Sequence, residues 1–155
     1  MKVRRYNEGE EETLWYLLYQ TVHTVNSRDY SLAQREAWAP SKCDLSKWKV
    51  RLRKTNPFVA EENGELIGFA ELEVNGHIDC FYCASNWQRR GVGSALLGAI
   101  EQEAASQGIT RLFADVSITA KGFFEAKGFF TEKEQMVSLC GEQLTNYAMS
   151  KHIRK

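Results

Sequence analysis

The segment that most constrains the fold is a glycine turn between an apolar run and an amphipathic stretch. The run from Ile78 to Ala84 is rich in residues that favour β-structure and predicts a buried strand. From Ser94 onward, apolar residues recur at helical spacing and predict an amphipathic helix. Between them lies the sequence QRRGVG, in which Gly91 and Gly93 permit a sharp turn without side-chain bulk. The chain is therefore expected to pass from strand to helix through this turn.

A turn of this kind gathers backbone N–H groups at the positive end of a helix dipole. Such a position binds a phosphate or diphosphate group, and Arg89 and Arg90 add positive charge. Two common nucleotide-binding fingerprints do not fit, because the turn lacks the G-x-G-x-x-G spacing and neither G-K-S nor G-K-T follows Gly93. The six residues alone leave open a plain, tight strand-to-helix loop.

The composition is that of a globular domain with a substantial core. Of the 155 residues, 43% are hydrophobic and 12% aromatic, and this length predicts one domain over residues 1–155. The formal net charge is zero, which argues against a nucleic-acid partner held by general phosphate attraction. No stretch approaches the ~18 consecutive apolar residues of a membrane span, so no membrane partner is expected.

The four cysteines do not form a disulfide framework in a chain of this length. The N-terminal residues also lack the apolar core of a secretion signal, so we expect a cytoplasmic protein. Cys80 and Cys83 are spaced like half of a zinc site, but strand residues three apart point to opposite faces. No second pair follows, so buried thiols and no metal are expected.

Hydrophobic spacing and turn signals predict the order of elements along the chain. Helices are expected over residues 8–25, 32–38, 45–53, 94–107 and 119–127. Strands are expected over residues 2–6, 57–62, 65–74, 78–84, 111–116, 129–139 and 144–153. Asn63-Gly64 and Asn75-Gly76 mark hairpins, so the strands between residues 57 and 84 form an antiparallel meander that leads into the glycine turn.

This order of elements, together with two motifs, resembles the GNAT N-acetyltransferase superfamily. Gln88, Gly91 and Gly93 match the fixed positions of its acyl-CoA diphosphate loop, [QR]-x-x-G-x-[GA]. The segment from Ala120 to Phe129, AKGFFEAKGF, resembles its A-x-x-F-Y-E-x-x-G-F motif. The resemblance covers essentially the whole chain. It implies an α+β fold in three layers (α/β/α), with helices on both faces of a mixed, mostly antiparallel sheet.

The resemblance implies an enzyme that moves an acetyl group from acetyl-CoA to an amine of a small molecule or peptide, by direct attack in a ternary complex. In the family, the strand before the turn splays from its neighbour, and a backbone amide there polarises the thioester carbonyl. In this chain, the resemblance implies that the backbone amide of Phe81 polarises the carbonyl. The oligomeric state stays open between a monomer and a homodimer. The implied cofactor site comprises Phe81, Tyr82, Cys83, Gln88, Arg89, Arg90, Gly91, Val92, Gly93, Ser94, Ser117 and Phe124.

Several residues are candidates for accepting the proton of the amine. By strand alternation, His77, Asp79 and Phe81 are expected to share one face. Asp79 and His77 fall where family members often carry a carboxylate or a polar group that holds water, and Glu71 and Glu73 on the preceding strand are alternatives. Because unpaired burial of a charge is costly, a purely structural role for Asp79, bonded to a backbone N–H or a cation, also stays open.

The chain departs from the family pattern at the general acid. The position of the usual tyrosine is Phe124, which has no hydroxyl group. The proton for the leaving thiolate is then expected to come through water, from Tyr82 or from Tyr147. Thiols have a pKa of ~8.5, so the thiolate leaves readily and turnover is expected to persist. The departure also favours an alternative function, an acyl-CoA-binding sensor or partner-binding module.

The acceptor site is expected near the early helices, which resemble the family least. Tyr30 and Trp38 are candidates for its wall, with Glu73 and Tyr147 as further substrate-binding residues. The alternative for the early aromatic residues is that they pack the helices onto the sheet.

Overall fold

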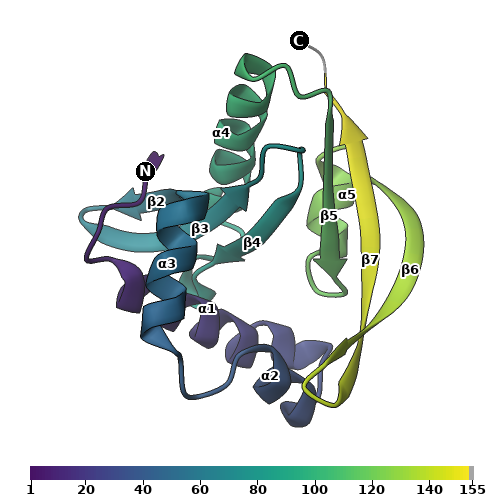
Figure 1. Cartoon of the computed structure of the whole chain (residues 1–155). Coiled ribbons are helices and arrows are strands. Elements are labelled where there is room, and N and C mark those ends of the chain that lie inside the picture. The colour runs from purple at the N-terminus through teal and green to yellow at the C-terminus, as the bar shows by residue number, and fades with distance from the viewer. Residues whose placement is uncertain (154–155) are drawn as a thin grey trace.

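Two antiparallel sheets, rather than one continuous sheet, form the frame of the molecule (Figure 1). The computed structural model describes residues 1–153. The first sheet has the strand order β1-β2-β3-β4 and the second has the order β5-β7-β6. The first contains β1 (Lys2–Arg5), β2 (Phe58–Glu62), β3 (Glu65–Leu72) and β4 (Ile78–Cys83). The second contains β5 (Arg111–Ser117), β6 (Phe130–Leu139) and β7 (Glu142–His152).

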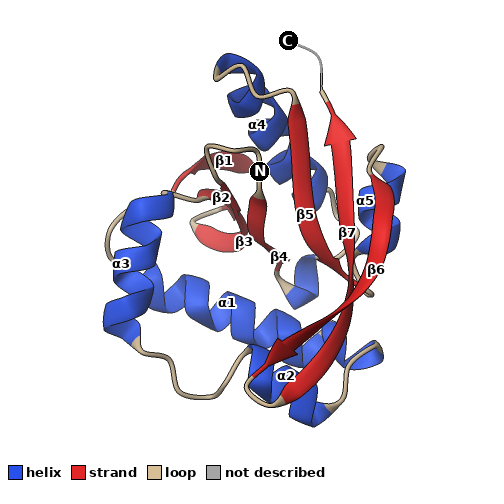
Figure 2. Cartoon of the chain, turned by 45° about the vertical axis from the view of Figure 1, so that its right-hand side comes forward, coloured by secondary structure: helices blue, strands red, loops and turns tan. Residues whose placement is uncertain are grey.

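Helices cover both faces of this frame, which confirms the expected α+β class (Figure 2). The elements α1 and α3 pack on one face of the first sheet, and α4 packs on its other face. The short helix α5 lies against the second sheet. The bounds are α1 (Glu11–Thr24), α2 (Leu32–Trp38), α3 (Leu45–Thr55), α4 (Val92–Ser106) and α5 (Lys121–Ala126). No helix within residues 1–153 is long and apolar enough to cross a membrane.

Two hydrophobic clusters, one on each face of the first sheet, hold the layers together. The larger cluster joins α4 and α5 to both sheets and includes Leu96, Ile100 and Leu112. The smaller cluster joins α1 and α3 to the first sheet. In it, the Trp15 and Trp48 rings meet edge to face with centroids 5.4 Å apart. These two tryptophans therefore pack the helices onto the sheet.

The two sheets meet at one end of β4 and diverge from there. His77 and Phe113 form an isolated parallel bridge, and the Phe113 N–H donates to the Gly76 carbonyl at 3.1 Å. Gly76 has a φ of +96°, and a Cβ there would collide with the carbonyl oxygen of Arg111, so only glycine permits this approach. Beyond the bridge, residues 1–153 show no further pairing of β4 with β5. A wedge therefore opens between these two strands.

A β-bulge at Cys80 interrupts the alternation of β4. The register of β3 against β4 skips Cys80, whose φ is +45°. As a result, Asp79 and Cys80 both contact Arg51 on α3, whereas Phe81 packs in the cluster on the α4 side. The prediction that His77, Asp79 and Phe81 share one face is wrong, because one extra residue reverses the alternation that follows it.

Candidate functional site

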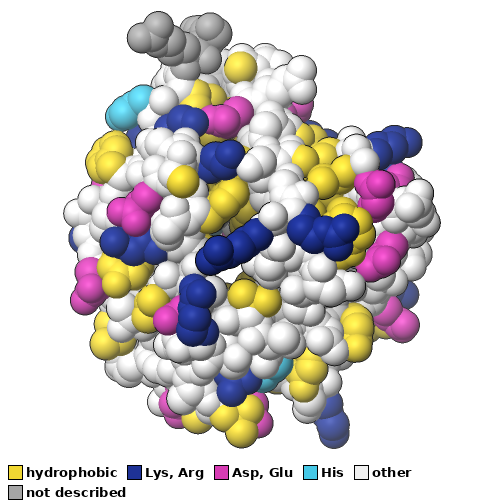
Figure 3. All heavy atoms as spheres, turned by 180° about the vertical axis from the view of Figure 1, so that it is seen from behind, with side chains coloured by type: hydrophobic (Ala, Val, Ile, Leu, Met, Phe, Trp, Pro, Cys, Tyr) yellow, Lys and Arg dark blue, Asp and Glu magenta, His cyan; other side chains and the backbone are white. Residues whose placement is uncertain are grey.

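A cleft of about 1020 Å³ occupies the wedge between β4 and β5. Its walls come from these strands, the end of α1, the glycine turn, α5 and β7. Figure 3 views the molecule from the side opposite to Figure 1 and shows Lys and Arg side chains gathered around a hollow. A cleft of this volume is at the upper end of the range for ligand sites.

The glycine turn forms one end of the cleft. Gly91 is the N-cap of α4 with a left-handed φ of +87°, and no side chain caps this helix end. The N–H groups of the first turn of α4 therefore have no side-chain partner, and they carry the positive end of the dipole of a 15-residue helix. Arg89, Gly91, Gly93 and Ser94 all line the cleft. This end is suited to an anionic group such as a diphosphate.

Three other residues of the turn have mainly structural contacts. The Gln88 side chain lines the cleft but donates to the Cys83 carbonyl at 2.8 Å, so it ties the turn to the end of β4. The Arg90 guanidinium lies 3.9 Å from the centroid of the Trp87 ring and does not line the cleft. Val92 is buried in the larger cluster.

Aromatic rings form the wall between the turn and the centre of the cleft. The Phe81 ring lies 5.2 Å from that of Phe124 and 5.7 Å from that of Phe123, centroid to centroid. Phe124 is buried and offers no hydroxyl, so this wall is apolar. The nearby Ser117 Oγ accepts a hydrogen bond from the Ala120 N–H at 3.1 Å, which leaves the hydroxyl proton of Ser117 available to the cleft.

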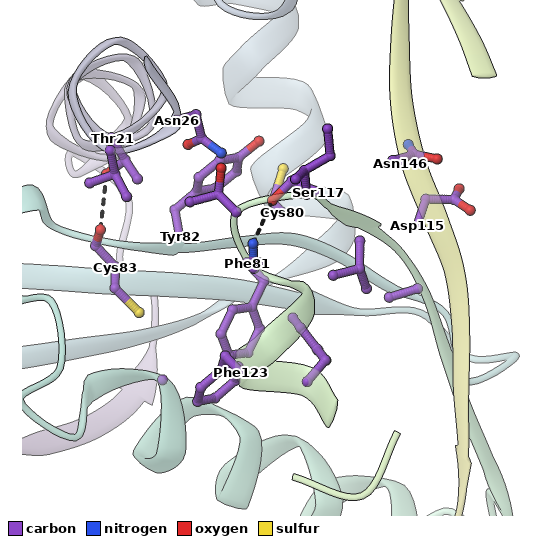
Figure 4. Close-up of a pocket in the computed structure, with 18 of the residues that line it drawn as sticks. Thr21, Asn26, Cys80, Phe81, Tyr82, Cys83, Asp115, Ser117, Phe123 and Asn146 are labelled. Atoms are coloured by element: carbon purple, nitrogen blue, oxygen red, sulfur yellow. Dashed lines mark hydrogen bonds between the residues drawn. The ribbon is translucent and has the colours of Figure 1, made fainter. Parts of the chain in front are cut away.

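Tyr82 brings a phenol to the other face of β4, beneath α1 (Figure 4). Its hydroxyl accepts a hydrogen bond from Trp38 Nε1 at 2.9 Å, and no acceptor for its own proton is found among residues 1–153. Burial raises the pKa of Tyr82 far above its ordinary value, so the phenol stays protonated at neutral pH. Burial also raises the pKa of the Cys83 thiol to about 12, which keeps this sulfur unreactive.

Asp79 belongs to a polar network behind β4. Its Oδ1 accepts from the Cys80 N–H at 2.9 Å, and its Oδ2 accepts from Arg51 Nη2 at 3.0 Å. The same Nη2 donates to Glu71 Oε1 at 2.6 Å, and Thr55 donates to the other Glu71 oxygen at 2.6 Å. The Asp79 side chain is 48% exposed and lines the cleft, whereas Glu71 is fully buried and does not. Glu71 is thus placed to orient Arg51 rather than to contact a ligand.

The carboxylates around Cys80 lie close enough together to resemble a metal site. Glu71, Asp79 and Cys80 form one such group, but the Arg51 guanidinium contacts all three. Because this fixed cation already supplies positive charge there, the donor set is a poor match for a metal ion.

Of the remaining residues that the sequence suggested for the site, His77 lines the cleft, whereas Glu73 and Tyr147 do not. His77 lies at the closed end of the cleft. Its Nδ1 lies 2.5 Å from Glu73 Oε1, and its ring packs against that of Phe113. Glu73 itself does not line the cleft. Tyr147 is also outside it, on the α5 side of the second sheet, with Lys121 Nζ 4.9 Å from its ring centroid.

Tyr30 closes the wide end of the wedge. Its hydroxyl donates to the Thr145 carbonyl at 2.6 Å and accepts from the Ile118 N–H at 2.9 Å. Tyr30 is 5% exposed, and its ring meets Trp38 edge to face. Both aromatic residues line the cleft, but the Tyr30 hydroxyl is fully used in joining the early helices to the second sheet.

Several polar cleft residues were not predicted from the sequence. Among them are Asn26 after α1, Asp115 on β5 and Asn146 on β7. Strand alternation offers a signal only for Asp115, which follows Phe113 by two residues as Asp79 follows His77. Placing it opposite Asp79 requires the pairing of His77 with Phe113, which the sequence does not give.

The splayed strands, the bulge and the uncapped glycine turn together define the class of acyl-CoA-dependent N-acetyltransferases. Consistent with this class, residues 26–151 match the acetyltransferase (GNAT) domain family. The chain therefore belongs to the GNAT family and is an N-acetyltransferase.

Individual relatives agree with this assignment. The chain is 36% identical to the N-acetyltransferase YafP of Escherichia coli strain K12, over 96% of this chain and 94% of that protein. It is similar to the crystal structure of a GCN5-related N-acetyltransferase from Rhodopseudomonas palustris, with a TM-score of 0.94, 31% identity and coverage of 98% and 95%. A PaiA N-acetyltransferase from Thermoplasma acidophilum, solved with coenzyme A, gives a TM-score of 0.79 at 20% identity, with 98% of each chain covered.

Proposed function

We propose that the cleft binds acetyl-CoA and an amine of a small molecule or peptide at the same time, and that the acetyl group passes directly from sulfur to nitrogen. The observation that carries the proposal is the uncapped, glycine-lined end of α4 at the mouth of the wedge between β4 and β5. The coenzyme A in the PaiA structure supports it at the level of the fold.

The residues present fit this co-substrate. The amides from Arg89 to Ser94 bind the diphosphate, with the Arg89 side chain beside it. The edge of β4 that faces the wedge binds the pantetheine arm through its backbone, as an added strand would. Phe81, Phe123 and Phe124 supply the apolar wall along this arm.

The reaction forms a C–N bond, breaks the C–S bond and moves one proton from the amine towards sulfur. The Phe81 amide, at the bulge of β4, donates to the carbonyl oxygen as negative charge develops there. Asp79 binds the acceptor amine and takes its proton, directly or through a water molecule, and Arg51 holds the carboxylate in place. His77, at the closed end of the cleft, is the second candidate for this base.

The proton for the thiolate comes from a hydroxyl other than that of the usual tyrosine. Tyr82 is the best candidate, because it lines the cleft and its hydroxyl has no acceptor for its proton among residues 1–153. Ser117 is the second, since its Oγ uses only its acceptor side in the hydrogen bond from Ala120. Tyr147 lies outside the cleft, which argues against it.

One observation favours a second function, that of an acyl-CoA sensor without turnover. Phe124 is buried against Phe81 and Phe129, so the position of the usual acid is a packed part of the core. A sensor would keep the glycine turn and need no acid.

The two functions are separated by measuring thiol release from acetyl-CoA over a panel of primary amines, with acetyl-CoA binding measured by calorimetry on the same protein. The enzyme predicts amine-dependent thiol release. Binding of the co-substrate without thiol release from any amine would favour the sensor.

A further inference from the structure

The bridge at the closed end of the wedge places two carboxylates opposite each other. His77 and Phe113 are parallel partners whose rings lie 5.1 Å apart, so their side chains project to the same side. Two residues further along each strand, Asp79 and Asp115 project to that same side. The strands have parted by then, so the carboxylates stand on the two walls of the cleft with space between them.

The two carboxylates differ in how their charge is balanced. Asp79 is paired with Arg51. Asp115 accepts one hydrogen bond from Gln135 Nε2, at 2.7 Å, and no ion pair of Asp115 with a Lys, Arg or His side chain occurs within residues 1–153. Asp115 therefore presents an uncompensated negative charge to the cleft.

Two amides that line the cleft also lack hydrogen-bond partners, and of these Asn146 lies beside Asp115 whereas Asn26 lies next to Tyr82 (Figure 4). Asn146 pairs across the sheet with Ser117, and its Oδ1 is the one buried side-chain N or O atom without a hydrogen bond among the described residues. Asn26 is only 5% exposed, lines the cleft and makes no side-chain hydrogen bond within residues 1–153. Figure 4 shows its amide turned from the end of α1 towards the side chain of Tyr82.

Tyr30 joins the backbone segments that carry these two residues. Its N–H donates to the Asn26 carbonyl at 3.1 Å, and its hydroxyl donates to the carbonyl of Thr145, next to Asn146. Unpaired buried polar groups are costly, so such groups in a cleft point to a ligand that satisfies them. Asp115 and Asn146 Oδ1 accept hydrogen bonds and do not donate them, so the matching ligand group is a donor with positive charge.

We infer that Asp115 and Asn146 bind a second, protonated amino group of the acceptor, so that the preferred acceptor is a diamine or longer polyamine. This inference rests on the proposed acetyl transfer in the same cleft. The reacting amine lies between Asp79 and the Phe81 amide, and the second amine reaches the opposite wall. Trp38, Val137 and Leu144 line the acceptor side and suit the methylene groups between the two nitrogens.

The test measures binding by calorimetry to the protein saturated with coenzyme A, which requires no turnover. The probes are 1,4-diaminobutane, n-butylamine and 4-amino-1-butanol, which differ only at the far end. The diamine is expected to bind at least about tenfold more tightly than either monoamine, as a charge-assisted hydrogen bond to a carboxylate predicts. Equal affinities, repeated with 1,3-diaminopropane and 1,5-diaminopentane, would overturn the inference.

Substitutions in the cleft test which residues cause the preference for a diamine over a monoamine. Asp115→Asn is expected to reduce the diamine preference to within about threefold, and Asn146→Asp is expected to increase it. An Asp115→Asn variant that keeps the wild-type preference would overturn the assignment, and Asn146→Leu provides the same test if Asp115→Asn does not fold. Failure of the proposed function is distinguished in the first titration, because it would appear as no binding of coenzyme A.

Discussion

The ring of Phe123 lies directly over Gly93. An ideal Cβ on Gly93 would stand 2.9 Å from Phe123 Cζ and 3.0 Å from its Cε1, which is closer than packed carbon atoms approach. Gly93 is in ordinary helical conformation, so the reason for a glycine here is space rather than backbone freedom. The contact places an aromatic ring from α5 against the first turn of α4, at the predicted diphosphate site.

Gly93→Ala is therefore expected to weaken acetyl-CoA binding about tenfold, because Phe123, which lines the cleft, must shift and change the wall beside the predicted diphosphate site. Calorimetry measures the affinity. Gly98→Ala is the matched control, since a Cβ at Gly98, in the same helix, meets nothing within 4 Å. The control should keep its affinity and gain up to about 1 kcal/mol of stability from helix propensity. Equal affinities of the two variants would refute this role of Gly93.

Asp79→Asn tests the proposed base. The change removes the charge but keeps the size of the side chain, so turnover is expected to fall at least about tenfold while acetyl-CoA affinity stays within about twofold. The separation of kcat from binding is informative because a mere loss of structure would lower both. An unchanged rate would remove Asp79 from the chemistry and leave it the structural role indicated by its bonds to Cys80 and Arg51.

Tyr82→Phe tests the proposed acid. It removes the hydroxyl that Trp38 contacts and is expected to lower kcat about tenfold or more at pH 7. Tyr147→Phe is the matched control outside the cleft and should keep wild-type kcat. If both variants turn over like the wild type, the proton reaches sulfur through Ser117 or water instead.

The stability of the fold should fall with acid in part through Glu10. Two hydrogen bonds from Arg4, at 2.7 and 3.1 Å, hold the pKa of Glu10 below its ordinary value of 4.5. A carboxylate with a depressed folded-state pKa stabilises the protein above its ordinary pKa and loses this effect as the pH falls through the folded-state value. Glu10→Gln should cost about 1 kcal/mol at pH 7 in urea unfolding and nearly nothing at pH 2. A cost independent of pH would contradict this account.

Much of the fold was predictable because it is encoded locally. Asn63-Gly64 takes positive φ at both residues and Gly76 takes φ of +96°, so the predicted hairpins form where turn chemistry requires them. The glycine turn and α4 also follow from short-range sequence. The first helix begins at Glu11 rather than residue 8, because Gly9 adopts a φ of +102° that helices exclude.

The arrangement of the site was less predictable because it depends on long-range contacts. A cysteine in a left-handed conformation has no sequence signature, so the bulge at Cys80 and the resulting reversal of Phe81 could not be foreseen. Likewise, Arg51 lies in a run of charged residues typical of a solvated face, yet tertiary packing brings it to Glu71 and Asp79. Asn26 after α1 and Asn146 on β7 are also far apart in the sequence, and only the folded chain brings both to the cleft.

The central claim is that the main-chain amides around Gly91 and Gly93, together with the edge of β4, bind acetyl-CoA. The most direct measurement is a titration of the ¹⁵N-labelled protein with acetyl-CoA, followed by amide chemical shifts. The account predicts that the largest shifts at saturation fall on Gly91, Gly93, Ser94 and Phe81. Saturation with large shifts elsewhere and none at these four amides, or no shifts at millimolar acetyl-CoA, would contradict it.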